Sequence, residues 1–223
     1  MKNIVVFTGA GISAESGLST FRDSNGLWKK YKIEDVATFG AFIKNPRLVL
    51  NFYNLRRKQL LKVEPNIAHI SLNELQYKFN LTIVTQNIDD LHERSGTKNV
   101  IHLHGKLTES KSIIDNKIYD IVGGELNVGD YCKKGGQLRP NVVWFGEAVP
   151  NMDLAIEVVR KASILIIIGT SLQVYPAATI IDYAINAERI ILVDTNPSIY
   201  KGIEVFKGKA TEIIPDLVRG LLS

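Results

Sequence analysis

The residues best suited to chemistry in this chain are short polar groups that each follow an apolar run. The first is the turn from Gly9 to Gly17, which follows residues 4–7 and also contains Gly11. The succession of a strand, closely spaced glycines and a helix start is typical of diphosphate binding. The backbone N–H groups at the start of the helix face the ligand, and no glycine Cβ keeps the ligand away. The spacing is not the G-x-G-x-x-G of ordinary dehydrogenases. A tight turn that binds nothing is the alternative.

A second polar group, residues 86–90, follows the apolar run at residues 81–85. Amide and carboxylate side chains at the carboxyl end of a parallel strand are able to bind ribose hydroxyls and a carboxamide. Taken alone, this group is more typical of a polar loop whose aspartate caps a helix.

Two histidines lie at the end of the next predicted strand, residues 100–103: His102 within it and His104 directly after it. Residues two apart on a strand share a face, so both side chains are expected to point the same way. His104, at the tip beside Gly105, is the better candidate for a general base, because a neutral imidazole accepts a proton near pH 7. A metal pair would need a third ligand that the spacing does not supply. A structural role for either histidine is the alternative.

Two further groups repeat this placement, and a third polar segment is extended. Residues 169–171 and 194–196 follow the apolar runs at 163–168 and 189–193, and residues 141–147 alternate as an extended segment does. The last segment could pair with a peptide backbone, or could be a core strand with a buried tryptophan. Because the carboxyl ends of parallel strands meet at one edge, the common placement predicts an extended nucleotide ligand there.

The elements that must position these groups alternate between strands and helices. Strands are predicted at residues 4–7, 81–85, 100–103, 163–168, 189–193 and 203–206, and helices at 46–63, 67–78, 152–161, 176–187 and 212–222. Alternation of this kind predicts an α/β fold with a Rossmann-like, doubly wound parallel sheet. Asn45 is the expected N-cap of the helix that begins at Pro46.

Two stretches interrupt the alternation and predict a small inserted lobe. These are residues 23–63, expected as an irregular loop leading into a helix, and residues 106–138, which are polar and weakly periodic. The core then comprises about residues 1–22, 64–105 and 139–223. A ligand is expected in the cleft between lobe and sheet.

Composition excludes several classes of protein. The 223 residues carry a formal charge of +4 without a dense basic run, so nucleic acid is not an expected partner. The single cysteine, Cys132, excludes an intrachain disulfide. The chain starts directly with a strand instead of a signal-type apolar region, and its longest apolar run is too short for a bilayer. We expect a cytoplasmic protein that does not bind membranes.

Seven sequence blocks together resemble the sirtuins, which are NAD-dependent protein-lysine deacylases. The blocks are Gly9-Ala10-Gly11-Ile12-Ser13, Phe21-Arg22, Gly26-Leu27-Trp28, Gln86-Asn87-Ile88-Asp89, His104-Gly105, Val143-Trp144-Phe145-Gly146-Glu147 and Gly169-Thr170-Ser171-Leu172. They occur in the family's order over nearly the whole chain. The resemblance implies NAD as co-substrate and acylated-lysine proteins or peptides as partners. We expect a monomer, although the sequence itself does not give the oligomeric state.

The resemblance also implies roles for individual residues. His104, Asn87 and Asp89 would be catalytic, with His104 as general base. The residues expected to bind NAD are Gly9, Ala10, Gly11, Ser13, Glu15, Phe21, Arg22, Trp28, Gln86, Asn87, Ile88, Asp89, Gly169, Thr170, Ser171, Asp194, Thr195, Asn196 and Ala210. Those expected to bind the acylated substrate are Ala37, Tyr53, Arg56, Val143, Phe145, Gly146 and Glu147.

In this family the acyl oxygen attacks C1′ of the nicotinamide ribose, and the base then activates a ribose hydroxyl to yield free lysine and acyl-ADP-ribose. Two other functions use the same pocket: a non-catalytic NAD sensor or scaffold, and an ADP-ribosyltransferase or NAD hydrolase. A hydride-transferring dehydrogenase is disfavoured by the glycine spacing.

A narrower resemblance concerns the acyl group. The run Phe52-Tyr53-Asn54-Leu55-Arg56-Arg57 resembles the sirtuin class that removes succinyl and malonyl groups as well as acetyl. Tyr53 and Arg56 share a helix face, so a phenol and a guanidinium are able to hold a carboxylate, with room left by Ala37. The alternative is that Arg56 is a solvated charge.

This sequence also departs from the family. Sirtuins usually carry two cysteine pairs that bind zinc in the segment 106–138, where this chain has only Cys132, and Asp115, Asp120 and Asp130 do not replace them. We therefore predict no zinc, and a lobe held by packing alone. Thr20 and Asp194 are smaller departures, from an aspartate and an asparagine respectively.

Overall fold

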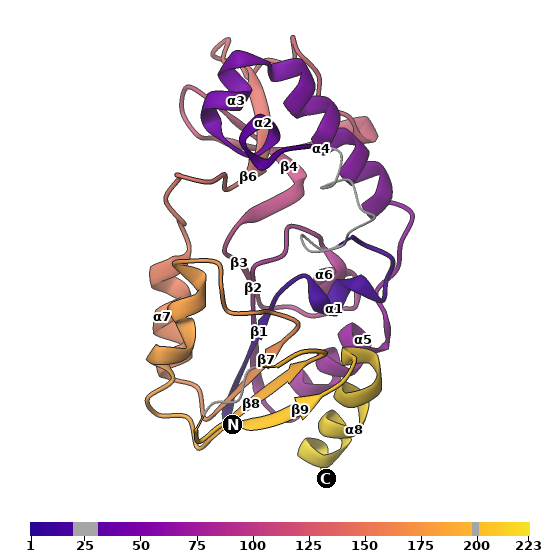
Figure 1. The fold of residues 1–223 in the computed structure, drawn as a ribbon, viewed down its shortest axis with the longest axis vertical. Coiled ribbons are helices and arrows are strands. Elements are labelled where there is room, and N and C mark those ends of the chain that lie inside the picture. Colours follow the sequence, from indigo (N-terminus) through magenta and orange to yellow (C-terminus); the bar gives the residue numbers. More distant parts are fainter. Residues whose placement is uncertain (20–30, 198–200) are drawn as a thin grey trace.

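A six-stranded parallel sheet forms the larger of two lobes in the computed structural model, which describes residues 1–19, 31–197 and 201–223 (Figure 1). Its strands are β1 (Asn3–Thr8), β2 (Asn80–Thr85), β3 (Val100–His102), β7 (Ile164–Ile168), β8 (Arg189–Asp194) and β9 (Glu204–Lys207). They lie in the order β3-β2-β1-β7-β8-β9. The predicted doubly wound sheet is thus confirmed, and its switch point lies between β1 and β7.

Helices cover both faces of this sheet (Figure 1). Ile4 and Val6 of β1 pack with α5 (Ile67–Glu74) and α8 (Ala210–Leu222), whereas Val5 and Phe7 pack with α7 (Met152–Arg160) and the 3₁₀ helix η4 (Ala177–Tyr183). A strand buried on two faces needs apolar residues at every position, which explains the unbroken apolar runs in the sequence.

The smaller lobe contains a three-stranded antiparallel sheet that the sequence did not predict. Its strands β4 (Gly105–Ser112), β5 (Ile118–Asp120) and β6 (Leu138–Val142) lie in the order β5-β4-β6. The buried positions of β4 are Leu107, Ser110 and Ser112, so two of its inward residues are polar and the alternation that marks a strand is lost. Because β6 pairs with β4, residues 139–142 lie in this sheet and not with the large one, where we expected them.

Helices complete the small lobe and connect it to the large one. These are α2 (Ile33–Val36), α3 (Phe39–Lys44), α4 (Pro46–Leu60) and the 3₁₀ helix η3 (Val122–Gly124), so the segment expected as an irregular loop is partly helical. The predicted start of α4 is confirmed, since Asn45 Oδ1 accepts a hydrogen bond from the Leu48 N–H at 3.1 Å.

Several predicted helix bounds were wrong. Residues 176–187 do not form an α-helix but the shorter η4, because consecutive β-branched residues (Thr179, Ile180 and Ile181) disfavour the α conformation. The helix predicted to residue 78 ends at Glu74 and continues as the 3₁₀ turn η2 (Leu75–Tyr77). The helix predicted to start at residue 212 starts at Ala210, and the short α6 (Leu91–Arg94) was not predicted.

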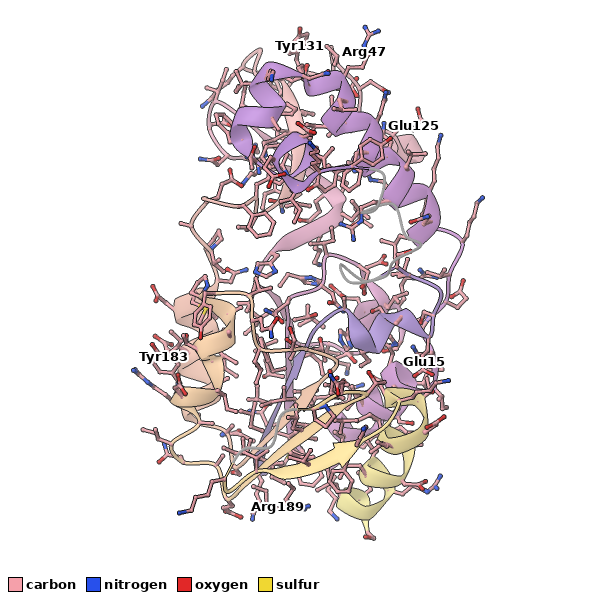
Figure 2. All side chains as sticks on the ribbon, in the orientation of Figure 1. Glu15, Arg47, Glu125, Tyr131, Tyr183 and Arg189 are labelled. Carbon is pink, nitrogen blue, oxygen red and sulfur yellow. The ribbon has the colours of Figure 1, made fainter. Side chains whose placement is uncertain are left out.

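Side-chain hydrogen bonds to backbone groups hold the small lobe, so the expectation of packing alone was wrong. Asn54 of α4 donates to and accepts from the backbone of Leu126, both at 3.0 Å. The buried Arg57 donates through Nε to the carbonyl of Leu107 at 2.7 Å. The two Nε2 hydrogens of Gln137 are shared among three carbonyls, and its Oε1 accepts from one N–H, all within residues 127–138. Charged and polar groups at the lobe's outer surface, such as Arg47, Glu125 and Tyr131, are seen in Figure 2.

Candidate active site

A cavity of about 860 Å³ lies at the carboxyl ends of β1, β2, β7 and β8 and continues to α4 and the segment after β6. The described part of the chain contributes nearly all of the predicted site residues to it. Those lining it are Gly9, Ala10, Gly11, Ser13, Glu15, Ala37, Tyr53, Arg56, Gln86, Asn87, Ile88, Asp89, His104, Val143, Phe145, Gly146, Glu147, Gly169, Thr170, Ser171, Asp194, Thr195 and Ala210.

Four of the predicted site residues, Asn196, Phe21, Arg22 and Trp28, are not among this set. Asn196 does not line the cavity, and its N–H donates instead to Asp194 Oδ1 at 2.8 Å. Thr20, Phe21, Arg22 and Trp28 lie outside the described residues.

The glycines of the first motif bring two loops into contact at the switch point of the sheet. The N–H of Gly9 donates to Ile168 O at 3.0 Å, and that of Gly11 donates to Gly169 O at 2.9 Å. A Cβ on Gly169, whose φ is +61°, would lie 2.5 Å from the backbone nitrogen of Ile12. These two N–H groups are therefore used within the protein, and the glycines are required for the close approach of the loops as much as for access by a ligand.

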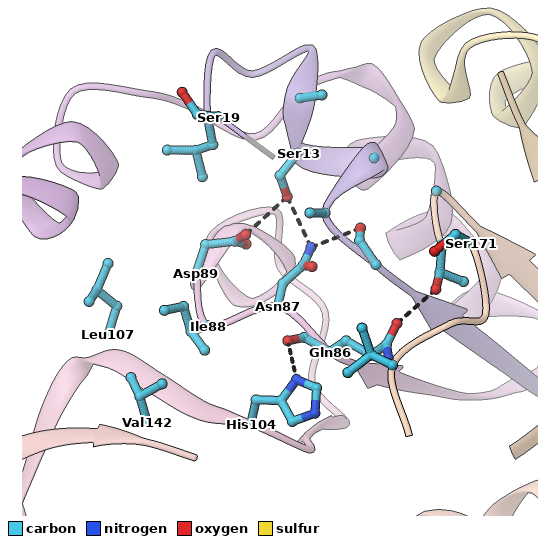
Figure 3. A pocket seen from close by; sticks show the side chains of 18 of the residues that line it. Ser13, Ser19, Gln86, Asn87, Ile88, Asp89, His104, Leu107, Val142 and Ser171 are labelled. Carbon is cyan, nitrogen blue, oxygen red and sulfur yellow. Dashed lines mark hydrogen bonds between the residues drawn. The ribbon is translucent and has the colours of Figure 1, made fainter. Parts of the chain in front are cut away.

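Asn87, Asp89 and Ser13 form a buried hydrogen-bonded cluster beside the glycine turn (Figure 3). Asn87 Nδ2 donates to Gly9 O at 3.1 Å and to Ser13 Oγ at 3.2 Å, and Ser13 Oγ donates to Asp89 Oδ2 at 3.0 Å. Burial raises the pKa of Asp89 above its ordinary value. The cluster fixes one amide and one carboxyl group at the centre of the cavity.

A hydrogen bond to the backbone of the preceding loop fixes the His104 ring in an orientation and tautomer suited to a base (Figure 3). Its Nδ1 lies 2.9 Å from Gln86 O. Because a carbonyl oxygen only accepts hydrogen bonds, Nδ1 carries the proton and Nε2 keeps its lone pair. Burial lowers the pKa of His104 below the ordinary 6.5, so the ring is neutral at pH 7. The Gln86 side chain is itself fixed, since Oε1 accepts from Thr170 Oγ1 at 2.8 Å.

His102 has a different environment, although it lies only two residues away. Its Nδ1 is 3.0 Å from Asn87 O and its Nε2 is 2.8 Å from Glu93 Oε1, and the ring is buried. It does not line the cavity. His102 therefore supports the Asn87 loop, which is the structural alternative for that histidine, and His104 alone of the two faces the cavity.

Tyr53 and Arg56 of α4 line the far end of the cavity together with Ala37. Tyr53 is buried, and its Oη accepts from Trp144 Nε1 at 2.9 Å. Burial raises the pKa of Tyr53 to about 12, so the phenol stays neutral. Burial lowers the pKa of Arg56, while the neighbouring Tyr53 and Asp89 act in the opposite direction. A phenol and a guanidinium thus meet in one partly apolar recess.

The segment after β6 is tied into the protein at alternate residues. The N–H of Val143 donates to His104 O at 2.9 Å, and that of Phe145 donates to Ala37 O at 3.0 Å. The carboxylate of Glu147 binds Arg139 through both oxygens. Trp144 is buried, as the alternative interpretation of this segment expected, whereas the Phe145 side chain is half exposed.

The cavity also has lining residues that the sequence analysis missed. Among them are Ser19, Gln59, Leu107, Val142, Gln173, Tyr175 and Lys209. Gln173 and Tyr175 lie two and four residues after the 169–171 motif, so extension of that motif would have found them. Leu107 and Val142 face the cavity only because β4 and β6 pair, and no local sequence pattern predicts this pairing.

Cys132 lies in the small lobe, away from this cavity. Its buried Sγ is 3.3 Å from both Ser112 Oγ and the Gly136 nitrogen, and these donors lower the pKa of the thiol. Within residues 1–19, 31–197 and 201–223, no group of three or more His, Cys, Asp or Glu side chains is placed to hold a metal ion. Over the same residues, no helix is both long and apolar enough to cross a bilayer.

Comparisons with known proteins agree with this arrangement. Residues 9–176 match the family model described as the Sir2 family. An NAD-dependent protein deacylase from Bacteroides thetaiotaomicron is 48% identical over 231 residues, which span 100% of this chain and 99% of the relative. A solved Sir2 homologue–NAD complex is 38% identical with a TM-score of 0.90, covering 99% of this chain and 90% of that one. A Sir2–p53 peptide–NAD⁺ complex is 29% identical with a TM-score of 0.80, covering 99% and 94%.

Proposed function

Because this chain belongs to the Sir2 family, we propose that it is an NAD-dependent protein deacylase that transfers an acyl group from lysine to ADP-ribose. The observation that carries the proposal is the continuous cavity that joins a glycine-lined switch point, a neutral histidine and a recess on α4. The relatives that carry this activity in their names match the chain over its full length, which supports the same assignment.

The cavity suits a dinucleotide in position and size. It lies at the switch point where such ligands bind in open α/β sheets, and its volume of about 860 Å³ is within the range of ligand sites. The turn from Gly9 to Ser13 would hold the diphosphate, and Asp194, Thr195 and Ala210 would lie on the adenosine side. When bound, NAD supplies the ADP-ribose that receives the acyl group as nicotinamide departs.

His104 is proposed to take up the proton of the attacking hydroxyl at Nε2. Two features suit this role: the Gln86 carbonyl fixes the tautomer, and burial keeps the ring neutral near pH 7. Asn87 and Asp89 are proposed to bind the ribose and the nicotinamide amide. Their mutual fixation through Ser13 means that little reorganisation is needed when these groups bind.

The preferred acyl group is proposed to be acidic, either succinyl or malonyl, with acetyl as a second substrate. A terminal carboxylate in the α4 recess would accept hydrogen bonds from the Tyr53 hydroxyl and the Arg56 guanidinium. The small Ala37 leaves space for the longer chain. We also propose that the enzyme works without zinc, since hydrogen bonds from Asn54 and Gln137 hold its small lobe.

A mass-spectrometric time course tests these proposals together. Matched succinyl-lysine and acetyl-lysine peptides are incubated with NAD and a chelator, and every product is identified. We expect rapid loss of succinyl, with free lysine and succinyl-ADP-ribose formed. Faster loss of acetyl would reject the acidic preference but keep the deacylase. NAD that stays intact would indicate a sensor, and ADP-ribose that is free or attached to protein would indicate a hydrolase or transferase.

Two variants of His104 test the base. His104→Ala removes the ring, whereas His104→Gln keeps a donor for the Gln86 carbonyl but is unable to accept a proton. Both are expected to lose at least about 100-fold in turnover, the size typical of a general base, while NAD affinity changes little. Normal turnover in either variant would refute the assignment.

A further inference from the structure

We infer that Trp144 is a specificity-determining positioning residue: its indole N–H turns the Tyr53 hydroxyl toward the acyl recess, and Glu147 acts on the substrate only through Trp144. Trp144 Nε1 donates to Tyr53 Oη at 2.9 Å. The inference rests on the proposed removal of acidic acyl groups. It revises the sequence-based expectation that Glu147 contacts the substrate itself.

Trp144 is held in one orientation by an ion pair between the buried Arg139 and the partly exposed Glu147. Glu147 Oε2 accepts from the Trp144 backbone N–H at 2.8 Å, and the two Glu147 oxygens bind Arg139 at 2.5 and 2.8 Å. The Arg139 guanidinium also stacks on the indole, with its carbon 3.5 Å from the ring centroid, and donates to Val142 O at 2.7 Å. Arg139 and Trp144 are both 2% exposed. A bidentate Arg–carboxylate pair whose arginine is buried and further hydrogen-bonded has a restricted geometry.

The fixed indole determines which way the phenol proton points. An indole nitrogen is only a donor, and a phenol oxygen carries one proton besides its lone pairs. Since the Trp144 N–H occupies the side of Tyr53 Oη that faces it, the phenol proton must turn away from Trp144. Tyr53 and Arg56 line the same cavity, so this leaves two donors for one ligand group. A carboxylate accepts from both, whereas an acetyl group has no carboxylate to offer.

Glu147 lines the cavity, but its hydrogen bonds and charge do not suit direct contact with an acidic acyl group. Both of its oxygens already accept hydrogen bonds, from Arg139 and from the Trp144 backbone. Burial raises the pKa of Glu147, but these donors and the Arg139 charge together bring the pKa below its ordinary value. Glu147 therefore remains an anion, which would repel an acidic acyl group that came close. Its negative charge instead balances that of Arg139.

The variant Trp144→Phe tests the inference, because it keeps a ring for Arg139 and for the packing but lacks the N–H. The measured quantity is the ratio of kcat/KM for a succinyl-lysine peptide to that for a matched acetyl-lysine peptide. We expect this ratio to fall about fivefold, the worth of one neutral hydrogen bond, mainly through a higher KM for the succinyl peptide. In a Tyr53→Phe background the same substitution should leave the ratio within about twofold, because the hydroxyl it positions is gone.

Phe42→Leu is the matched structural control. The Phe42 ring packs on Trp144 with the centroids 5.5 Å apart but has no part in the hydrogen bonds, and it does not line the cavity. This variant should lower the thermal midpoint without changing the ratio. The inference fails if Trp144→Phe leaves the ratio unchanged, whether or not both activities fall. It also fails if Trp144→Phe lowers the ratio as strongly in the Tyr53→Phe background as in the wild type. In either case the acidic preference stands. A wild-type enzyme that does not remove succinyl overturns both.

Discussion

Replacement of Arg56 by methionine separates the two acyl substrates most directly. Methionine keeps an unbranched, apolar stem in the α4 recess but removes the guanidinium, so the packing beside Tyr53 changes little. A hydrogen bond to a charged group contributes about 1.5–3 kcal/mol, which corresponds to roughly a 10- to 150-fold fall in kcat/KM for the succinyl peptide. Arg56 keeps some contact with solvent in the structure, so we expect the lower part of this range.

The assay compares kcat/KM for succinyl-lysine and acetyl-lysine peptides of one sequence, in wild type and in Arg56→Met. Acetyl offers no partner for the guanidinium, so its kcat/KM should fall by less than about threefold. Lys58→Met is the matched control, because Lys58 lies on the same helix, is exposed, and pairs with Glu125 at 2.6 Å outside the cavity. Equal losses on both peptides in Arg56→Met, or a similar change of selectivity in Lys58→Met, would refute the acidic recess.

Four further predictions follow from the structure. Because burial lowers the pKa of His104, the acid limb of the kcat/KM profile should lie below pH 6.5; a limb above that value would exclude a neutral, buried base. Gly169→Ala should lower the free energy of unfolding in urea by about 2 kcal/mol or more and weaken NAD binding measured by calorimetry. The reason is that the new Cβ would lie 2.5 Å from Ile12 N at a φ of +61°. A variant as stable as the wild type would show that the two loops relax around the Cβ. Gln137→Ala should lower the free energy of unfolding by about 2 kcal/mol, because its hydrogen bonds within the small lobe are lost. A chelator should leave the thermal midpoint of the wild type unchanged, and a lower midpoint with chelator would reveal a structural metal. Burial lowers the pKa of His69 to about 4, so as the pH falls the unfolded chain takes up a proton at this residue before the folded protein does. The free energy of unfolding should therefore fall by up to about 3 kcal/mol between pH 6.5 and 4. His69→Gln should reduce this pH dependence, and an unaltered pH dependence would assign it to other groups.

The large lobe could be predicted from the chain because its rules are local. An apolar run such as Ile164–Ile168 predicts a strand covered on both faces, and the polar group that follows it predicts a loop. Parallel strands bring their carboxyl ends to one edge whatever their order, so Gly9, Asn87 and Gly169 had to meet once the sheet was parallel. The location of the cofactor cavity follows from pattern and topology together.

Other features depended on contacts that have no local period. The strands β4 and β5 are too polar to be recognised alone. β4 forms because β6 supplies a partner and α4 packs against it, and β5 pairs in turn with β4. His102 and His104 differ only in what surrounds them: a carboxylate and a carbonyl engage both nitrogens of the first, and one carbonyl holds the second. The hydrogen bond from Trp144 to Tyr53 joins residues 91 positions apart. Residue types therefore determined which groups were available for chemistry, whereas packing decided their tautomers, orientations and partners, because hydrogen-bond geometry is set by the atoms that burial brings together.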